Sequence, residues 1–269
     1  MSQQTRPVVP LQDIVSPASR ISSSVRQIGL LLLAVLLVGT AGHQSPVQSQ
    51  DQAALPEMRV PKVDDFAITG KGDAPAWNKA DWTVLKKRNS ADANYTSRVK
   101  MLHAPKGVYV LFDGTDELIT ATMTRDYDQL WTEDVYECFF WPDEKQPIYF
   151  EYELSPLGYE LPILVPNLNG KIMGWLPWMY EGDRKIQKKL SATEGTLTSK
   201  GKVTGWRAEV FIPYELLKPL LNVPPAPGSR WRGNFYRMDY DHGKTSSWDW
   251  ARVGPSFHEF QKYGTLIFE

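Results

Sequence analysis

The chain of 269 residues contains a single cysteine, Cys138, so it forms no intrachain disulfide and holds no cluster of thiolate metal ligands. It also lacks a surplus of positive charge, since 30 Lys and Arg stand against 31 Asp and Glu and no long basic run interrupts the body of the chain. Phosphate binding needs a basic footprint, which argues against nucleic acid as a partner. Cys138 lies in an apolar stretch and is expected to be a buried small hydrophobic residue.

The apolar run at residues 28–38 is short for a membrane span, which needs about 20 residues. It follows a polar leader with Arg6, Arg20 and Arg26, and it ends in small residues. This order is typical of a secretory signal peptide. We therefore expect residues 1–42 to direct the protein to the periplasm or out of the cell. The alternative is an uncleaved membrane anchor formed by residues 28–42, the one case in which the protein contacts a membrane.

Residues 43–57 are rich in Gln and Ser and are expected to form a disordered linker. Residues 58–269 show no internal repeat and predict one folded domain, with enough apolar sequence (42% of the chain) for one sizeable core. Short β-branched and aromatic runs, parted by Gly, Pro, Asn and Asp, predict strands joined by turns. The predicted strands are 60–68, 97–102, 107–112, 118–124, 134–141, 146–154, 171–175, 186–192, 206–212, 231–240, 247–251 and 263–268. With one helical turn at 213–217, they indicate an all-β sandwich.

The stretch 130–143 carries the strongest functional signal. From Val135 to Trp141 it reads as a strand buried on both faces, yet Glu137 sits within it. Because a carboxylate is costly to bury without donors, Glu137 is expected to point into a polar groove. Trp131 precedes it on a polar loop, and an indole beside an inward carboxylate suits a sugar, whose C–H face stacks on the ring. Alternatively, Trp131 plugs the end of the sandwich and Glu137 pairs with an Arg.

Two further stretches place side chains on defined strand faces. In residues 149–154 the side chains alternate, so Glu151 and Glu153 share one face and the aromatic residues the other. Trp248 and Trp250 share a face around Asp249, and one of them is a candidate for the floor of a binding site, with core packing expected for at least one. The ten Trp and 12 Tyr exceed ordinary usage, and in a β protein part of such an excess lies on a binding face.

Several stretches, taken together, resemble the family 9 carbohydrate-binding modules and their stand-alone relatives. The likeness runs in order over roughly residues 60–269. It is carried by Trp131–Phe139, Tyr149–Gly158, Gly205–Pro213, Gly233–Arg237 and Ser256–Phe268. The resemblance implies an antiparallel β-sandwich of the Ig-like or jelly-roll type. It also implies non-catalytic binding of a sugar end between two aromatic rings.

The resemblance also implies roles for single residues. Trp131 matches the first ring, and the second falls at Phe257, where the family can carry Trp. Glu137 matches an acceptor for sugar hydroxyls, and Asn234 aligns with an amide-bearing position on a neighbouring strand. Calcium ions are often structural in these modules, but their ligands do not map residue by residue onto this sequence.

Other candidates are secondary. Arg237 is out of phase with Asn234 on a period of two, so it is expected to face away from the groove and to pair with an acid. His258, beside Phe257, is a candidate donor to a hydroxyl. Glu153 and Trp248 complete the set of predicted ligand-binding residues. An insert at 162–185, which carries Trp175, either caps the groove or packs over a sheet edge.

The sequence thus favours an exported, non-catalytic carbohydrate-binding protein, accessory to carbohydrate breakdown. A glycoside hydrolase is the alternative, but it needs two carboxyls across a cleft, about 5–5.5 or 6.5–9.5 Å apart, and Glu151 and Glu153 instead share one strand face. A haem-binding sandwich domain is a further alternative; Met101 and His103 face the same side of a strand and would not straddle a haem. An adhesion module without a small ligand also stays open.

Overall fold

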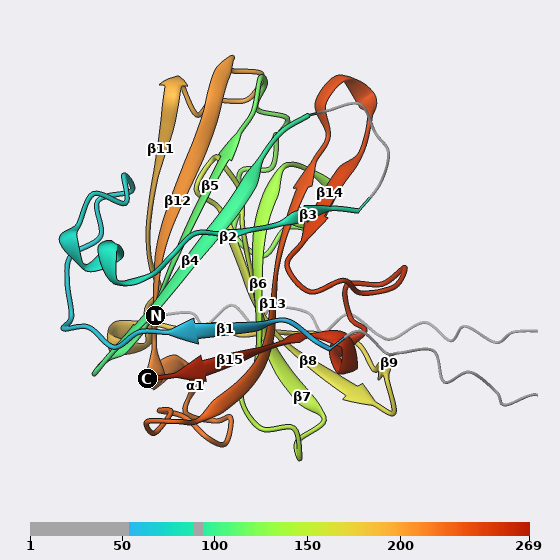
Figure 1. The fold of residues 1–269 in the computed structure, drawn as a ribbon. Helices are drawn as coiled ribbons and strands as arrows, with labels where there is room; N and C mark the ends of the chain where they lie inside the picture. The colour runs from blue at the N-terminus through green and yellow to red at the C-terminus, as the bar shows by residue number, and fades with distance from the viewer. Residues whose placement is uncertain (1–53, 89–93) are drawn as a thin grey trace, which may run out of the picture. The chain divides into compact units, whose positions relative to one another are not determined.

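The computed structural model describes residues 54–88 and 94–269 (Figure 1). The predictions for residues 1–42, and for 43–53 of the linker, lie outside these residues. The first strand, β1, begins at Glu57, next to the predicted start of the domain. Within the two described ranges, no helix has both the length and the apolar character to cross a membrane.

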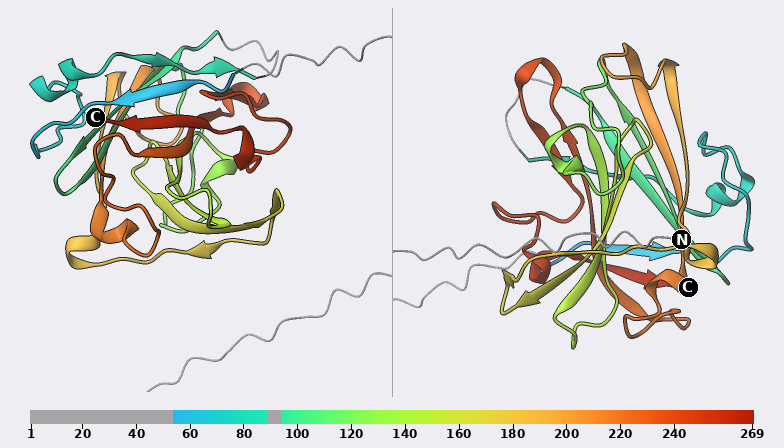
Figure 2. Two further views of the ribbon diagram at one scale, coloured as in Figure 1. Left: turned by 60° about the horizontal axis from the view of Figure 1, so that its bottom comes forward. Right: turned by 180° about the vertical axis from the view of Figure 1, so that it is seen from behind.

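Two β-sheets form the described domain. The large sheet runs β1-β15-β13-β6-β7-β8-β10, with β14, β3 and β9 paired at its margins, and the small sheet runs β11-β12-β5-β4-β2. β1 and β15 pair in parallel, side by side in Figure 2. The large sheet contains β1 (Glu57–Val60), β3 (Lys86–Lys87), β6 (Val135–Trp141), β7 (Ile148–Leu154), β8 (Glu160–Leu168), β9 (Lys171–Ile172), β10 (Leu176–Pro177), β13 (Arg230–Asp239), β14 (Ser246–Asp249) and β15 (Gly264–Phe268). The small sheet contains β2 (Thr83–Val84), β4 (Ser97–Ala104), β5 (Gly107–Thr115), β11 (Gln187–Gly195) and β12 (Val203–Pro213).

In the part of the chain that the structure describes, helical structure is limited to short turns, one of which the sequence predicts. The predicted turn at 213–217 is the α-helix α1 (Tyr214–Leu217). Five 3-10 turns are η1 (Pro75–Lys79), η2 (Leu130–Thr132), η3 (Gly182–Arg184), η4 (Asp241–Gly243) and η5 (Phe260–Lys262). The prediction of an all-β sandwich is confirmed.

The main core lies between the two sheets, and period-two alternation explains it. In β6, Tyr136, Cys138 and Phe140 face the small sheet. The Tyr136 ring stacks on Phe112 of β5 with centroids 4.7 Å apart, and Trp206 of β12 lies 4.1 Å from it. Burying such side chains stabilises the fold by about 1.5–3 kcal/mol each. Cys138 is buried here, as expected.

A second apolar cluster covers the outer face of the large sheet. It includes Phe139 of β6, Tyr149 of β7, Ile163 of β8 and Tyr236 of β13, closed over by Tyr263. Since β6 is therefore covered on both faces, all of its residues are buried, which agrees with its nearly continuous apolar sequence. This outer face carries the site described below.

The predicted strands differ most from the observed ones in three places, and the two-residue strands β2, β3 and β10 were also not predicted. β8 was missed and occupies the start of the predicted insert 162–185. Its two prolines, Pro162 and Pro166, argued against a strand, but both turn toward the β9–β10 side, where their carbonyls accept from Trp178 and Met173. Residues 118–124 form no strand beyond an isolated bridge at Leu118, and β1 ends at Val60 instead of continuing to 68.

Candidate functional site

A cavity of about 390 Å³ opens on the outer face of the large sheet. Its base consists of Glu137 and Phe139 from β6 with Glu151 and Glu153 from β7. Odd-numbered positions of both strands face this side, because side chains alternate across a strand. We call Glu137, Glu151 and Glu153 together the carboxyl floor.

Aromatic side chains flank the carboxyl floor on opposite sides. Phe257 stacks on Tyr236 of β13 with centroids 4.0 Å apart, whereas Trp175 directly precedes β10 at the other end of the strand order β13-β6-β7-β8-β10. Both line the cavity, so β6 and β7 lie between them. Trp131, from η2, meets Trp175 edge to face with centroids 6.3 Å apart. The cavity therefore has a Trp131–Trp175 wall and a Phe257 wall.

The Phe257 wall is a layered stack and not a free ring. Tyr236 takes one face of Phe257, and the guanidinium of Arg88 lies over the ring, 4.8 Å from its centroid. Arg88 is held by Asp249 and by the carbonyl of Gly254, each at 2.6 Å. This side of the cavity thus presents a guanidinium layered on an aromatic ring.

The carboxyl floor is buried and incompletely paired. The exposed fractions of Glu137, Glu151 and Glu153 are 1%, 3% and 1%. Within the described residues, Oε1 of Glu137, Oε2 of Glu151 and Oε2 of Glu153 have no hydrogen-bond partner. Because buried polar atoms are nearly always bonded, three such oxygens in one cavity call for a ligand or water.

Burial raises the pKa of all three carboxyls, and repulsion by neighbouring acids adds to it for Glu137 and Glu153, whereas a hydrogen bond with Glu153 acts against it for Glu151. Burial, with the charge of Glu151, raises the pKa of Glu137 well above its usual range, and the nearby Arg88 acts against this. Burial raises the pKa of Glu151 to about 8, and burial with the two neighbouring acids raises the pKa of Glu153. In the ligand-free site at neutral pH the carboxyls therefore hold protons and both donate and accept hydrogen bonds.

His258 lines the cavity beside the carboxyl floor. Its Nδ1 forms a hydrogen bond with the hydroxyl of Tyr149 and lies 3.6 Å from Oε2 of Glu151. Burial lowers the pKa of His258, so the imidazole is neutral at neutral pH. On the opposite side of the floor, the hydroxyl of Tyr240 donates to the carbonyl of Trp131 and fixes the loop that carries this indole.

The predicted site residues divide into two groups. Trp131, Glu137, Glu153, Phe257 and His258 meet in the cavity. Asn234, Arg237 and Trp248 do not line it, and their predicted contact with a ligand needs correction.

Asn234 is a structural amide behind the cavity wall. Its Nδ2 donates to the hydroxyl of Tyr236 at 2.8 Å and to the carbonyl of Ala251, and its Oδ1 accepts from the N–H of Ala251. These bonds use the amide completely. Asn234 thus fixes Tyr236, on which Phe257 stacks.

Arg237 and Trp248 lie on the opposite side of the sheet from the cavity. Arg237 is buried and pairs with Asp116 at 3.0 Å and Asp239 at 2.8 Å, as its phase on the strand predicts. Trp248 and Trp250 both belong to the core between the sheets. The hypothesis that one of these two tryptophans floors the site is wrong, since glutamates and Phe139 occupy that position.

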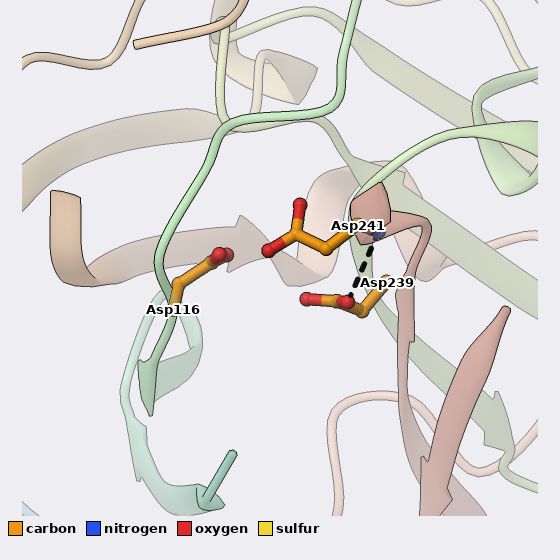
Figure 3. A group of neighbouring side chains, drawn as sticks. All are labelled: Asp116, Asp239 and Asp241. Carbon is orange, nitrogen blue, oxygen red and sulfur yellow. Dashed lines mark hydrogen bonds between the residues drawn. The ribbon is translucent and has the colours of Figure 1, made fainter. Parts of the chain in front are cut away.

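The acids around Arg237 are the candidate for a calcium site in the described residues. Asp116, Asp239 and Asp241 are buried, point toward one another, and place one oxygen each within 4.8 Å of the others (Figure 3). Arg237 already binds two of these carboxylates, and the hydroxyls of Tyr95 and Thr120 donate to Asp241. An ion here would share its ligands with a guanidinium, whose charge would repel it. The residues therefore do not fit the calcium ion that the resemblance implies.

Trp175, Arg88 and Tyr240 are among the lining residues that sequence reasoning missed. Trp175 was recognised only as part of the insert 162–185, for which capping of the groove was one of two alternatives. Arg88 carried no signal, and Tyr240 was predicted only as the last residue of the strand 231–240; both reach the cavity only through the tertiary fold. Glu151 was detectable, since it shares a strand face with Glu153.

The fold is a β-sandwich with a cavity on the outer face of one sheet. A family model described as carbohydrate-binding family 9 matches residues 73–268, and the chain belongs to this family. The resemblance noted in the sequence is thereby confirmed. A search of curated proteins finds no significant match.

Solved structures share the fold. A putative carbohydrate-binding protein from Bacteroides uniformis is 19% identical, with a TM-score of 0.65 over 80% of this chain and 100% of its own. A family 9 module from Caldicellulosiruptor kristjanssonii in complex with cellotriose is 13% identical, with a TM-score of 0.56 over 80% and 94%. The corresponding glucose complex has 13% identity and a TM-score of 0.57 over 80% and 96%. At these identities the likeness concerns the fold.

Proposed function

We propose that this protein is an exported, non-catalytic carbohydrate-binding protein whose cavity holds the end of a sugar or oligosaccharide as an accessory to carbohydrate breakdown. The observation that carries this proposal is the carboxyl floor, with its unpaired oxygens, between the Trp131–Trp175 wall and the Phe257 wall. Family membership and the glucose and cellotriose complexes of a family 9 module support it.

Each part of the cavity suits a saccharide. A sugar ring has apolar C–H faces edged by hydroxyls, so an indole supplies stacking contact and the carboxyls supply hydrogen bonds that fix orientation. Stacking on an aromatic ring is worth about 1–3 kcal/mol for a nucleic-acid base, and a sugar face gives a similar or smaller amount. With two or three hydrogen bonds, this corresponds to binding constants of about micromolar to millimolar.

The arrangement of the carboxyls favours binding over hydrolysis. Glu137 lies directly opposite Glu153 in the register of β6 and β7, and Glu151 is two residues away on the same face. All three therefore approach a ligand from the same side. Glycoside hydrolysis needs carboxyls that flank the scissile bond from two sides.

Calorimetric titration with glucose, xylose, cellobiose and cellotriose tests the proposal. We expect binding by the unmodified protein and at least a tenfold loss in Trp131→Ala. Trp82→Ala is the matched control, because Trp82 is also half-buried but packs on Arg98 at the small sheet. Absence of binding across the panel would contradict the proposal. Release of reducing sugar from a polysaccharide would favour the hydrolase alternative instead.

Export is the part of the proposal that depends on residues 1–42. Cell fractionation with an antibody against the folded domain should place the protein in the periplasm or the medium. Recovery in the membrane fraction would favour the uncleaved anchor at residues 28–42.

A further inference from the structure

We propose that the cavity selects saccharides that carry a protonated amino group, with the ammonium bound by the carboxyl floor. This inference rests on the proposed function and specifies its ligand. It follows from the number of unpaired acidic oxygens, the shortage of cations around them, and the hydrogen bonds that an ammonium forms.

The unpaired oxygens converge from two adjacent strands. Glu137 of β6 faces Glu153 of β7 across the sheet, and Glu151 lies two residues along on the same face. Each is at least 97% buried and keeps one oxygen without a partner in the described structure. An ammonium has three N–H donors and no acceptor, so it can bond more than one carboxylate oxygen and asks none of them to donate. A sugar hydroxyl brings only one donor.

The charges around the carboxyl floor are unbalanced. Among the described lining residues, Arg88 is the only Lys or Arg, and it already pairs with Asp249. The remaining titratable groups facing the floor are neutral at neutral pH, namely His258, Tyr149 and Tyr240. The three carboxyls thus lack a dedicated counter-charge, so they hold protons in the empty site, and an ammonium would supply the charge that their ionised form needs.

A metal ion fits these residues less well than an ammonium. Among the residues that the structure describes, the acids whose oxygens all lie within 4.8 Å of one another are Asp116, Asp239 and Asp241, and the carboxyl floor is not such a set. An ammonium, unlike a metal ion, does not need all three carboxyls at once, because an N–H that misses a carboxylate can bond water. The aromatic walls suit the sugar ring attached to the amine.

Binding of the amine is coupled to release of protons. Burial raises the pKa of all three carboxyls, so the floor is protonated in the empty site. An incoming ammonium stabilises the carboxylate form, and the displaced carboxyl proton passes to the buffer while the amine keeps its own. Affinity for the amino sugar therefore rises with pH until the amine itself loses its proton, near pH 8 by analogy with an α-amino group. Affinity for a neutral sugar does not rise in this way.

The test compares glucosamine, glucose, N-acetylglucosamine and glucuronate by calorimetric titration at pH 7. We expect glucosamine to bind at least tenfold more tightly than glucose, and glucuronate more weakly than glucose. N-acetylglucosamine controls for bulk at the same carbon, because acetylation removes the charge, and it should lose the advantage. Repeating the glucosamine titration in buffers of different ionisation enthalpy should show proton release, which glucose should lack.

Glu151→Gln should lower the affinity for glucosamine at least fivefold more than that for glucose. Glu194→Gln, which changes an exposed acid on β11, is the matched control and should alter neither. Equal binding of glucose and glucosamine would overturn the amine assignment and leave the proposed function standing. Failure of every sugar to bind would overturn both. Calcium binding that is lost in Glu151→Gln would overturn the amine assignment and show that the carboxyl floor binds a metal ion instead.

Discussion

Both sheets bury glutamate on their outer faces, but only on the small sheet is the buried carboxylate fully hydrogen-bonded. On the small sheet, Glu209 of β12 is fully buried and accepts from the N–H groups of Thr69 and Gly70 and from the indole of Trp77, at 2.9, 2.7 and 2.7 Å. On the large sheet, the carboxyl floor is equally buried and keeps three oxygens unpaired. Burial of an acid is therefore no functional signal in itself. The signal is burial without partners.

The difference has an energetic meaning. Donors aimed at Glu209 compensate for its desolvation, so it holds the loop of residues 69–77 against the sheet. The unpaired oxygens of the carboxyl floor have no such backbone or indole donors, and their burial destabilises the empty protein. Sites that bind ligands often carry such a cost, which the ligand then removes.

Arg237→Leu should give the largest effect on stability. It would leave Asp116 and Asp239 buried without their cation and turn paired acids into unpaired ones. We expect a loss of about 3–5 kcal/mol in the free energy of unfolding. Calorimetry would show this as a fall in Tm of about 10 °C.

Arg59→Leu is the control for Arg237→Leu. Arg59 pairs with Glu269 at 3.5 Å, but its side chain is 76% exposed, so its removal should matter little. Equal effects of the two substitutions would contradict the view that pairing of the buried acids stabilises the fold.

Glu209→Ala should destabilise the protein somewhat less, by about 2–3 kcal/mol, because several buried N–H donors lose their acceptor at once. Urea denaturation followed by tryptophan fluorescence measures this. Sugar binding at 25 °C should be unchanged, since Glu209 belongs to the other sheet. A coupled loss of binding would show that the two outer faces are not independent.

The same contrast explains what the sequence could predict. Alternating residues set the faces of β6 and β7, so Glu137, Glu151 and Glu153 were correctly assigned to one side of their strands. Pairing is a tertiary property, however. No local sequence pattern distinguishes the paired Glu209 from the unpaired glutamates of the carboxyl floor, because its donors lie more than 130 positions earlier in the chain.

Asn234 and Trp175 also show that contacts between distant parts of the chain are not predictable from local sequence. Asn234 shares the strand face of Tyr236, which made it a plausible ligand, but the carbonyl of Ala251 and the Tyr236 hydroxyl already bind its amide. Trp175 reaches the cavity because the chain returns along β8 as β9 and β10 at the edge of the sheet. The sequence analysis did not predict β8. Local patterns fix strand faces, whereas contacts between distant loops depend on the complete fold.

Glu151→Gln should stabilise the empty protein, in contrast to Glu209→Ala. The pKa of Glu151 rises from 4.5 to about 8 on folding, so the folded state binds more protons than the unfolded state between these values. Stability should therefore fall as pH rises from about 5 to about 8. At pH 8 the substitution should recover about 4 kcal/mol, and near pH 4 almost none. A Tm series across pH measures this, and a gain that is independent of pH would contradict it.

Removal of calcium should have the smallest effect. Arg237 supplies the positive charge within Asp116, Asp239 and Asp241, so a chelator, or 1 mM calcium added after it, should shift Tm by less than about 1 °C. The absence of a Tm shift is informative, because a calcium ion present at a hundred times its dissociation constant would add about 2.7 kcal/mol to the free energy of unfolding. In Arg237→Leu the same acids lack their cation, and calcium should now raise Tm. A calcium-dependent rise in the unmodified protein that Asp241→Asn abolishes would show that guanidinium and ion share the cluster.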